Sequence, residues 1–188
     1  GTGNRGYRAD LAISGDRIED IGRDLEPADH GCVTIDAAGK IVCPGVVDPH
    51  SHADMTVWQD GHEKLLEPLV RQGITTFVGG NCGMSMAPLT DRNPEELRMY
   101  LEGFTAREMG PEITWKNTAG FMDHIEKNGA ALNTALLAPH GLMRIDAMGM
   151  ATRHAMKDEV RHMQYVLEES MEAGAIGYLL KNVSADEL

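Results

Sequence analysis

The chain has 188 residues, of which 42% are hydrophobic and 24% are charged, so it is long enough to bury a substantial core. Its formal net charge of -12 argues against binding to nucleic acid or to an anionic membrane, because both partners require a basic patch. No apolar run approaches the roughly 18 residues of a membrane span. The three cysteines are widely spaced without a CxxC motif, which fits a reducing compartment, and we expect a cytoplasmic protein.

The first 43 residues have the pattern of a small antiparallel β unit. Short β-like stretches alternate with turn signals, in the order "YRADLAIS", "GD", "RIEDIG", "CVTID", "AAGK" and "IVCPG". This pattern predicts the N-terminal part of a small β domain at residues 1–43, followed by a second region at 44–188.

After Pro44 the chain alternates between strand and helix patterns. The predicted strands are 46–52, 74–83, 132–141 and 175–180, and the predicted helices are 62–73, 93–103, 118–129 and 156–174. This alternation predicts an α/β fold with a parallel sheet, which closes either as a doubly wound sheet or as a (β/α)8 barrel. Neither a GxGxxG motif nor a P-loop follows a strand, which removes the usual reason to prefer the doubly wound form.

Potential metal ligands lie at three successive strand ends. On a strand, the alternation of side chains would make His50 and His52 converge, and Cys82 and His140 follow the next two strands. Imidazoles and a thiolate suit zinc, and Asp48 could complete the shell or orient an imidazole. Spacing alone leaves other interpretations open: an incidental HxH, a buried cysteine and a histidine that caps a loop.

Two segments resemble a known family. "PGVVDPHSHAD" resembles the first-strand signature of the amidohydrolase superfamily, and "RQGITTFVGGNCGMSMAP" is similar to the N-acyl-D-amino-acid deacylases (D-aminoacylases) within it. "HGLMRIDAMG" and "EVRHMQYVLEESMEAGAIG" resemble the middle section of that family. The resemblance implies part of a (β/α)8 TIM-type barrel, about its first four strands, preceded by part of a small β-sandwich domain.

The resemblance also implies a set of site residues. His50 and His52 match the HxH, which in this family lies at the weaker or second metal position. Cys82 matches the ligand of the tightly bound zinc, in place of the carboxylated lysine of other amidohydrolases. His140 and Arg144 match a segment that lines the pocket, although this chain has "APHGLMR" where the family often has a glycine before the histidine.

The activity implied by the resemblance is zinc-dependent hydrolysis of an N-acyl-D-amino acid to a D-amino acid and a carboxylate. In this family the general-base aspartate follows the last barrel strand and two further zinc histidines come from later strands, so we expect all three in a missing C-terminal half. We therefore expect the chain to be an incomplete fragment, inactive alone, that associates with its missing half or with a second copy.

Two alternative functions remain open. A cyclic-amide hydrolase of the hydantoinase or dihydroorotase kind would require a lysine to bridge two metals, and Lys181 follows the fourth predicted strand. A truncated, non-catalytic relative that binds metal or a partner chain is the other alternative.

Overall fold

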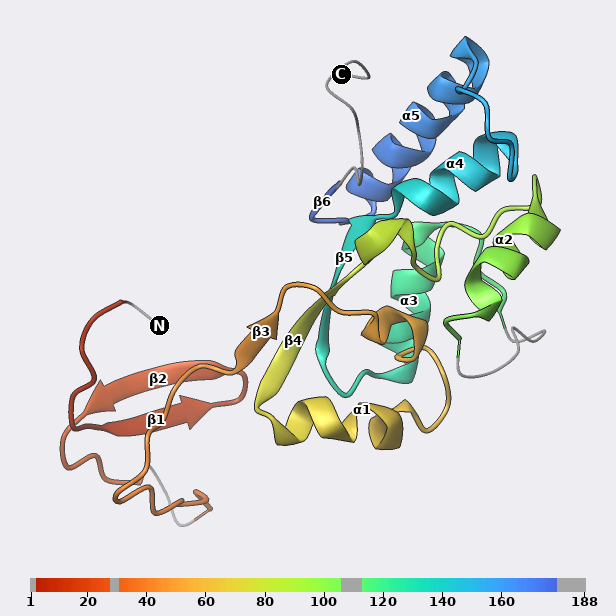
Figure 1. The fold of residues 1–188 in the computed structure, drawn as a ribbon. Coiled ribbons are helices and arrows are strands. Elements are labelled where there is room, and N and C mark those ends of the chain that lie inside the picture. Colours follow the sequence, from red (N-terminus) through yellow and green to blue (C-terminus); the bar gives the residue numbers. More distant parts are fainter. Residues whose placement is uncertain (1–2, 28–30, 106–112, 179–188) are drawn as a thin grey trace. The chain divides into compact units, whose positions relative to one another are not determined.

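The computed structural model describes residues 3–27, 31–105 and 113–178, and the chain forms two compact units, Gly1–Pro44 and Gly45–Leu188 (Figure 1). The division lies one residue beyond the boundary expected from the change in sequence pattern. Among the described residues, no helix is both long enough and apolar enough to cross a membrane.

The N-terminal unit contains an antiparallel hairpin of β1 (Asp10–Ser14) and β2 (Arg17–Gly22). The two further strands predicted at 32–36 and 41–45 are wrong, because both segments are irregular. A β-branched stretch becomes a strand only where another strand pairs with it, and the structure gives these two segments no such partner within the described residues.

The second unit is built on a parallel sheet. Its strands are β3 (Val46–Asp48), β4 (Ile74–Gly79), β5 (Asn133–Ala138) and β6 (Gly177–Tyr178), in the order β3-β4-β5-β6. All three pairings are parallel, so the carboxyl ends of the strands lie at one edge of the sheet. The predicted α/β fold with a parallel sheet is confirmed.

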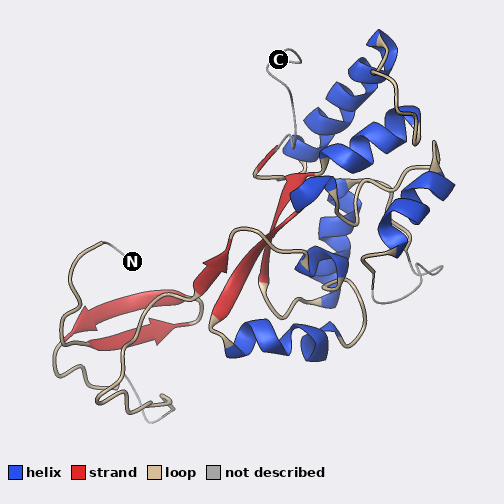
Figure 2. Cartoon of the chain, viewed as in Figure 1, coloured by secondary structure: helices blue, strands red, loops and turns tan. Residues whose placement is uncertain are grey.

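The helices of this unit connect and flank the strands (Figure 2). They are α1 (His62–Arg71), α2 (Pro94–Glu102), α3 (Thr118–Asn128), α4 (His140–Met148) and α5 (Lys157–Glu172). Helix α1 packs on β4, and α4 packs on both α2 and α5. Helix α4 was not predicted, because its first residues were assigned to the end of the preceding strand.

The strand predicted at 46–52 is shorter and more exposed than expected. It ends at Asp48, because Pro49 has no N–H to donate to a ladder, and the residues after it form a bend. Ser51 then donates its N–H to the carbonyl of Val78 at 3.1 Å, which keeps the segment beside the end of β4. The valines of β3 are half exposed, since β4 is its only partner among the described strands.

Two groups of buried side chains hold the second unit together. The larger one fills the space between the sheet and helices α1 to α4, and Phe77, Leu101 and Phe121 in it are completely buried. The smaller one joins β5, α4 and α5 through Ala138, Met143 and their neighbours.

The smaller group gives a matched test of packing. Met143 on α4 is 1% exposed and Met99 on α2 is 65% exposed. Met143→Ala should lower the free energy of unfolding by about 2–5 kcal/mol, because it removes buried methylene groups and leaves a cavity. Met99→Ala should change it by less than about 0.5 kcal/mol. Urea unfolding of both variants measures the difference, and equal effects would contradict this description of the core.

The start of α5 is held by a charged clamp. Glu159 Oε1 and Oε2 accept hydrogen bonds from the guanidinium of Arg153 at 2.6 and 2.7 Å, and Oε2 also accepts from the backbone N–H of Met156 at 2.7 Å. The hydrogen bond with Arg153 and then the Met156 N–H lower the pKa of the Glu159 carboxyl from 4.5 to about 2.

The clamp predicts an acid-sensitive contribution to stability. Because the pKa of Glu159 is lower in the folded chain than in the unfolded chain, its contribution is complete above pH 4.5 and is lost as the pH falls to about 2. Glu159→Gln should remove this part of the pH dependence. Thermal unfolding between those two pH values, compared for the original chain and the variant, measures it, and parallel pH profiles would contradict the assignment.

Candidate metal centre

Three side chains from the ends of β3 and β4 meet at one point. Cys82 Sγ lies 3.4 Å from Nε2 of His50, and the ligand atoms of His50, His52 and Cys82 all lie within 4.8 Å of one another. The two imidazole rings are 6.0 Å apart at an angle of 78°. The described part of the chain thus brings together the HxH and the cysteine that sequence spacing singled out.

The three side chains fit a zinc ion. Two imidazole nitrogens and one thiolate form a borderline-soft donor set of the kind that zinc prefers. With Zn–S near 2.3 Å and Zn–N near 2.0–2.1 Å, tetrahedral geometry separates sulfur and nitrogen by roughly 3.6 Å. The 3.4 Å between Cys82 and His50 agrees with that separation. Three ligands leave at least one tetrahedral position for another donor.

Cys82 is presented by a strained turn, Asn81–Gly83. Its backbone has φ 57° and ψ 17°, a left-handed conformation that non-glycine residues rarely adopt. Gly80 before it has φ 77°, and a Cβ there would lie 2.0 Å from the carbonyl oxygen of Leu137. The Asn81 side chain donates to the carbonyl at the end of β4 at 2.7 Å. Close packing therefore holds the thiol at this position against its backbone preference.

Asp48 and Asp54 flank the two histidines in sequence but occupy different environments. Asp48 Oδ1 accepts the backbone N–H of His50 at 3.1 Å and so shapes the bend. Asp48 does not belong to the group of ligand atoms described above. Asp54 is completely buried, and its Oδ2 accepts the N–H of Gly80 at 3.0 Å.

The surroundings of the buried Asp54 carboxyl change its pKa. Burial raises its pKa, while the Ser85 hydroxyl, the Gly80 N–H and His52 act in the opposite direction. Although Ser85 is close enough to affect the pKa, Oδ1 of Asp54 makes no well-formed hydrogen bond within the described residues.

His140 and Arg144 are not part of the ligand group. His140 begins α4, and its Nδ1 lies 2.5 Å from the phenol oxygen of Tyr178. Burial, and then the positive charge of Arg144, lower the pKa of His140 below its usual 6.5, so the imidazole is neutral at pH 7. Arg144 donates from Nη2 to the carbonyls of Ala151 and Arg153 at 3.1 and 2.8 Å, which holds the connection between α4 and α5.

Two tyrosines near these residues were missed by the sequence analysis. Tyr178 lies on β6 and is paired with Ala138 at the end of β5. Tyr100 lies on α2, with its phenol against Gly141. Burial, and then the charge of Cys82, raise the pKa of the Tyr100 phenol. Neither tyrosine has a spacing signal, because both reach the site through tertiary packing. Lys181, on which the cyclic-amide alternative depends, lies outside the described residues.

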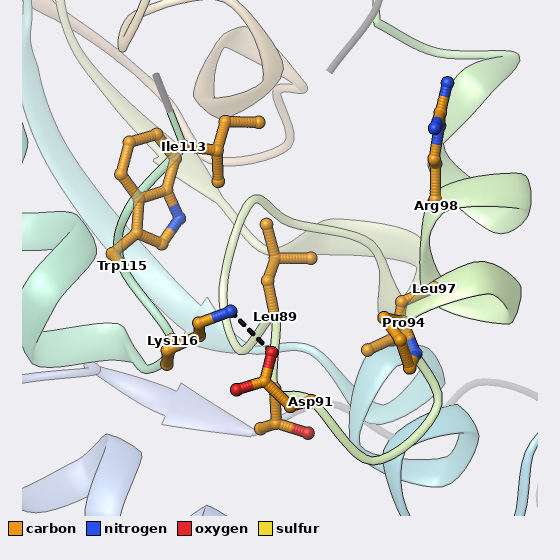
Figure 3. A pocket seen from close by; sticks show the side chains of 9 residues that line it. Leu89, Asp91, Pro94, Leu97, Arg98, Ile113, Trp115 and Lys116 are labelled. Atoms are coloured by element: carbon orange, nitrogen blue, oxygen red, sulfur yellow. Dashed lines mark hydrogen bonds and ion pairs between the residues drawn. The ribbon is translucent and has the colours of Figure 1, made fainter. Parts of the chain in front are cut away.

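A small pocket of about 160 Å³ lies between α2 and the connection that leads to α3 (Figure 3). An ion pair of 2.7 Å joins Lys116 to Asp91 within it. The pocket is smaller than the roughly 300–1,000 Å³ of typical ligand sites, and none of the three ligand residues lines it. Its lining residues are Leu89, Thr90, Asp91, Pro94, Leu97, Arg98, Ile113, Trp115 and Lys116.

Candidate imidazole and thiol ligands therefore lie at the carboxyl edge of a parallel sheet, where the active sites of α/β barrels are found. A model of the Amidohydrolase family matches residues 33–188. The chain therefore belongs to the amidohydrolase family, as the first-strand resemblance predicted.

The relatives include D-aminoacylases and related deacylases. The D-aminoacylase of Alcaligenes xylosoxydans xylosoxydans is 35% identical over 178 residues, which are 94% of this chain and 34% of that protein. A solved N-acyl-D-glutamate deacylase of Bordetella bronchiseptica, complexed with zinc and a phosphonate inhibitor, matches with 32% identity and a TM-score of 0.73. A solved D-aminoacylase with a binuclear metal centre matches with 30% identity and the same TM-score.

These matches confirm the predicted family branch and fold class. Both structural matches cover 94% of this chain and 35% of the other one. The chain thus spans about a third of the length of the relatives it matches, and its four parallel strands form part of a barrel.

The cysteine gives the sharpest test of the metal centre. Cys82→Ala should weaken zinc binding by more than the roughly 10- to 100-fold that loss of an outer hydrogen-bond partner costs, because it removes a direct ligand. Cys43→Ala is the matched control, since that thiol is exposed and lies outside the cluster. Competition with a chromophoric chelator measures both affinities, and equal affinities would rule out Cys82 as a ligand.

Proposed function

We propose that this chain forms the N-terminal part, including the first half of the barrel, of a zinc-dependent amide hydrolase that acts on N-acyl-D-amino acids. The observation that carries the proposal is the thiol of Cys82 within reach of the two histidines at the carboxyl edge of the sheet. Membership of the amidohydrolase family and the deacylase names of the relatives support the substrate class.

The proposed zinc ligands of this chain are His50, His52 and Cys82. The chemistry that zinc supplies at such a site is polarisation of the acyl carbonyl and a lower pKa, about 7, for a bound water. The chain's own contribution is to hold two imidazoles and a thiol in place, and the strained turn at Cys82 fixes the direction of the sulfur.

His140 and Arg144 are proposed to face the substrate. His140 follows the carboxyl end of β5, the same edge that carries the metal ligands, and its hydrogen bond with Tyr178 fixes one ring nitrogen. A neutral imidazole in this position offers a hydrogen bond rather than a charge to an amide. Arg144 secures the α4–α5 connection beside it. Asp48 contributes by shaping the bend that carries His50.

We further propose that the protein is cytoplasmic. We also propose that catalysis requires a complete barrel. A (β/α)8 barrel has eight strands, and the second unit contributes β3 to β6. The remaining strands would come from more of the same chain or from a second chain, and would supply the general-base carboxylate and further metal ligands. The first unit is proposed as part of a small β domain attached to this barrel.

The test is to purify the protein from its native source and to measure its intact mass, its zinc content and its activity. We expect a mass well above 20.5 kDa, tightly bound zinc, and release of free amino acid from N-acyl-D-amino acids but not from the L enantiomers. A chelator should abolish the release and added zinc should restore it. A mass near 20.5 kDa without zinc, or hydrolysis of cyclic amides instead, would overturn the proposal.

A further inference from the structure

Asp54 connects the two segments that carry the ligand residues. It lies in the short helical turn Ala53–Met55, directly after the HxH, and is completely buried. Its Oδ2 accepts the N–H of Gly80, which is 26 residues further along and immediately precedes the turn that presents Cys82. One carboxylate oxygen therefore ties the histidine segment to the cysteine turn.

Close packing fixes the orientation of this carboxyl group. A Cβ on Gly79 would lie 2.6 Å from Cγ of Asp54 and 2.7 Å from its Cβ, so the side chain lies directly against the end of β4. Only a residue without a side chain allows this approach. The carboxyl group is completely buried, and so is its second oxygen, Oδ1.

Two polar atoms beside this contact are buried without a partner. Within the described part of the chain, Oδ1 of Asp54 and Nδ1 of His52 are the buried side-chain nitrogen and oxygen atoms that make no hydrogen bond. Buried polar groups in proteins are almost always paired, so each such atom calls for an explanation. The two are chemically complementary, because a neutral imidazole can donate from Nδ1 and a carboxylate accepts.

The buried position of Nδ1 also decides which nitrogen of His52 is available. Since Nδ1 is shielded from solvent, Nε2 is the nitrogen left to face an ion. A histidine that binds a metal through one nitrogen usually donates a hydrogen bond from the other, often to a carboxylate, and this bond fixes the tautomer. Asp48 does not fill this role, because its Oδ1 is occupied by the backbone of the other histidine.

We propose that Asp54 is the positioning residue of this metal centre. Its Oδ2 holds the turn of Cys82 through Gly80. Its Oδ1 and Nδ1 of His52, which are not bonded in this structure, would pair, and this bond would leave Nε2 unprotonated and directed at the ion. A single buried carboxylate would thus orient one candidate ligand after each of two neighbouring strands. The proposal rests on the zinc site proposed above.

The first experiment determines the tautomer of His52 by nitrogen-15 NMR of the metal-free protein, at a pH where the imidazole is neutral. We expect the proton on Nδ1 in the original protein. In Asp54→Asn the oxygen of the amide can still accept the Gly80 N–H, but its NH₂ group would face Nδ1 and favour the proton on Nε2. A proton on Nε2 in the original protein would overturn the proposal, even if the variant does not fold.

The second experiment measures zinc affinity by chelator competition. Asp54→Asn should raise the zinc dissociation constant by roughly 10- to 100-fold, the usual cost of losing an outer hydrogen-bond partner. The matched control is Asp146→Asn, because Asp146 is equally buried but pairs with Thr90 and His162, outside the ligand group. It should leave the affinity unchanged, and equal losses in both variants would show that Asp54 is only structural.

The two experiments separate this proposal from the proposed function. If the original protein binds no zinc, the metal site fails, while the tautomer of His52 in the metal-free protein still decides whether Asp54 orients it. If zinc binds but Asp54→Asn has the original affinity and tautomer, the metal site stands and the role of Asp54 is refuted.

Discussion

The parallel pairing of β3 with β4 decides where the chemistry of this chain lies. Asp48 at the end of β3 is paired in register with Phe77, two residues before the end of β4. Because neighbouring strands are only about 4.8 Å apart, side chains that follow their carboxyl ends can reach a common point. The two histidines and the cysteine therefore meet without any long loop to bring them together.

The turn at Cys82 shows how the sheet supports an unfavourable backbone. A left-handed conformation persists at a non-glycine residue only where the surroundings over-determine it. Here three contacts restrain residues 80–83: the hydrogen bond of the Asn81 side chain, the hydrogen bond from Gly80 to Asp54, and the packing of Gly80 on Leu137. The restraint comes from β4, β5 and the helical turn Ala53–Met55 together, so the direction of the thiol depends on the assembled unit.

The sequence predicted the features that depend on local pattern. Long periodic segments such as α5 and buried runs such as β4 were found, and the HxH and Cys82 were identified by type and spacing. The features that depend on tertiary partners were missed. The alternation that favoured Asp48 as an orienting residue holds only on a strand, and Pro49 ends that strand before the histidines. The histidines lie instead in a bend that leads into a short helical turn. The contact of this turn with Gly80 could not be predicted from residue spacing.

The three candidate ligand residues lie within 33 consecutive positions, and the short helical turn Ala53–Met55, helix α1 and strand β4 lie between the histidines and the cysteine. Contacts between segments that are close in sequence form faster than contacts between distant ones, because less chain entropy is lost when the loop closes. Once β3, α1 and β4 have left the ribosome, the cluster has all the chain it needs. If zinc binds as proposed, it could then be captured during synthesis, before the strands that follow have folded onto the sheet.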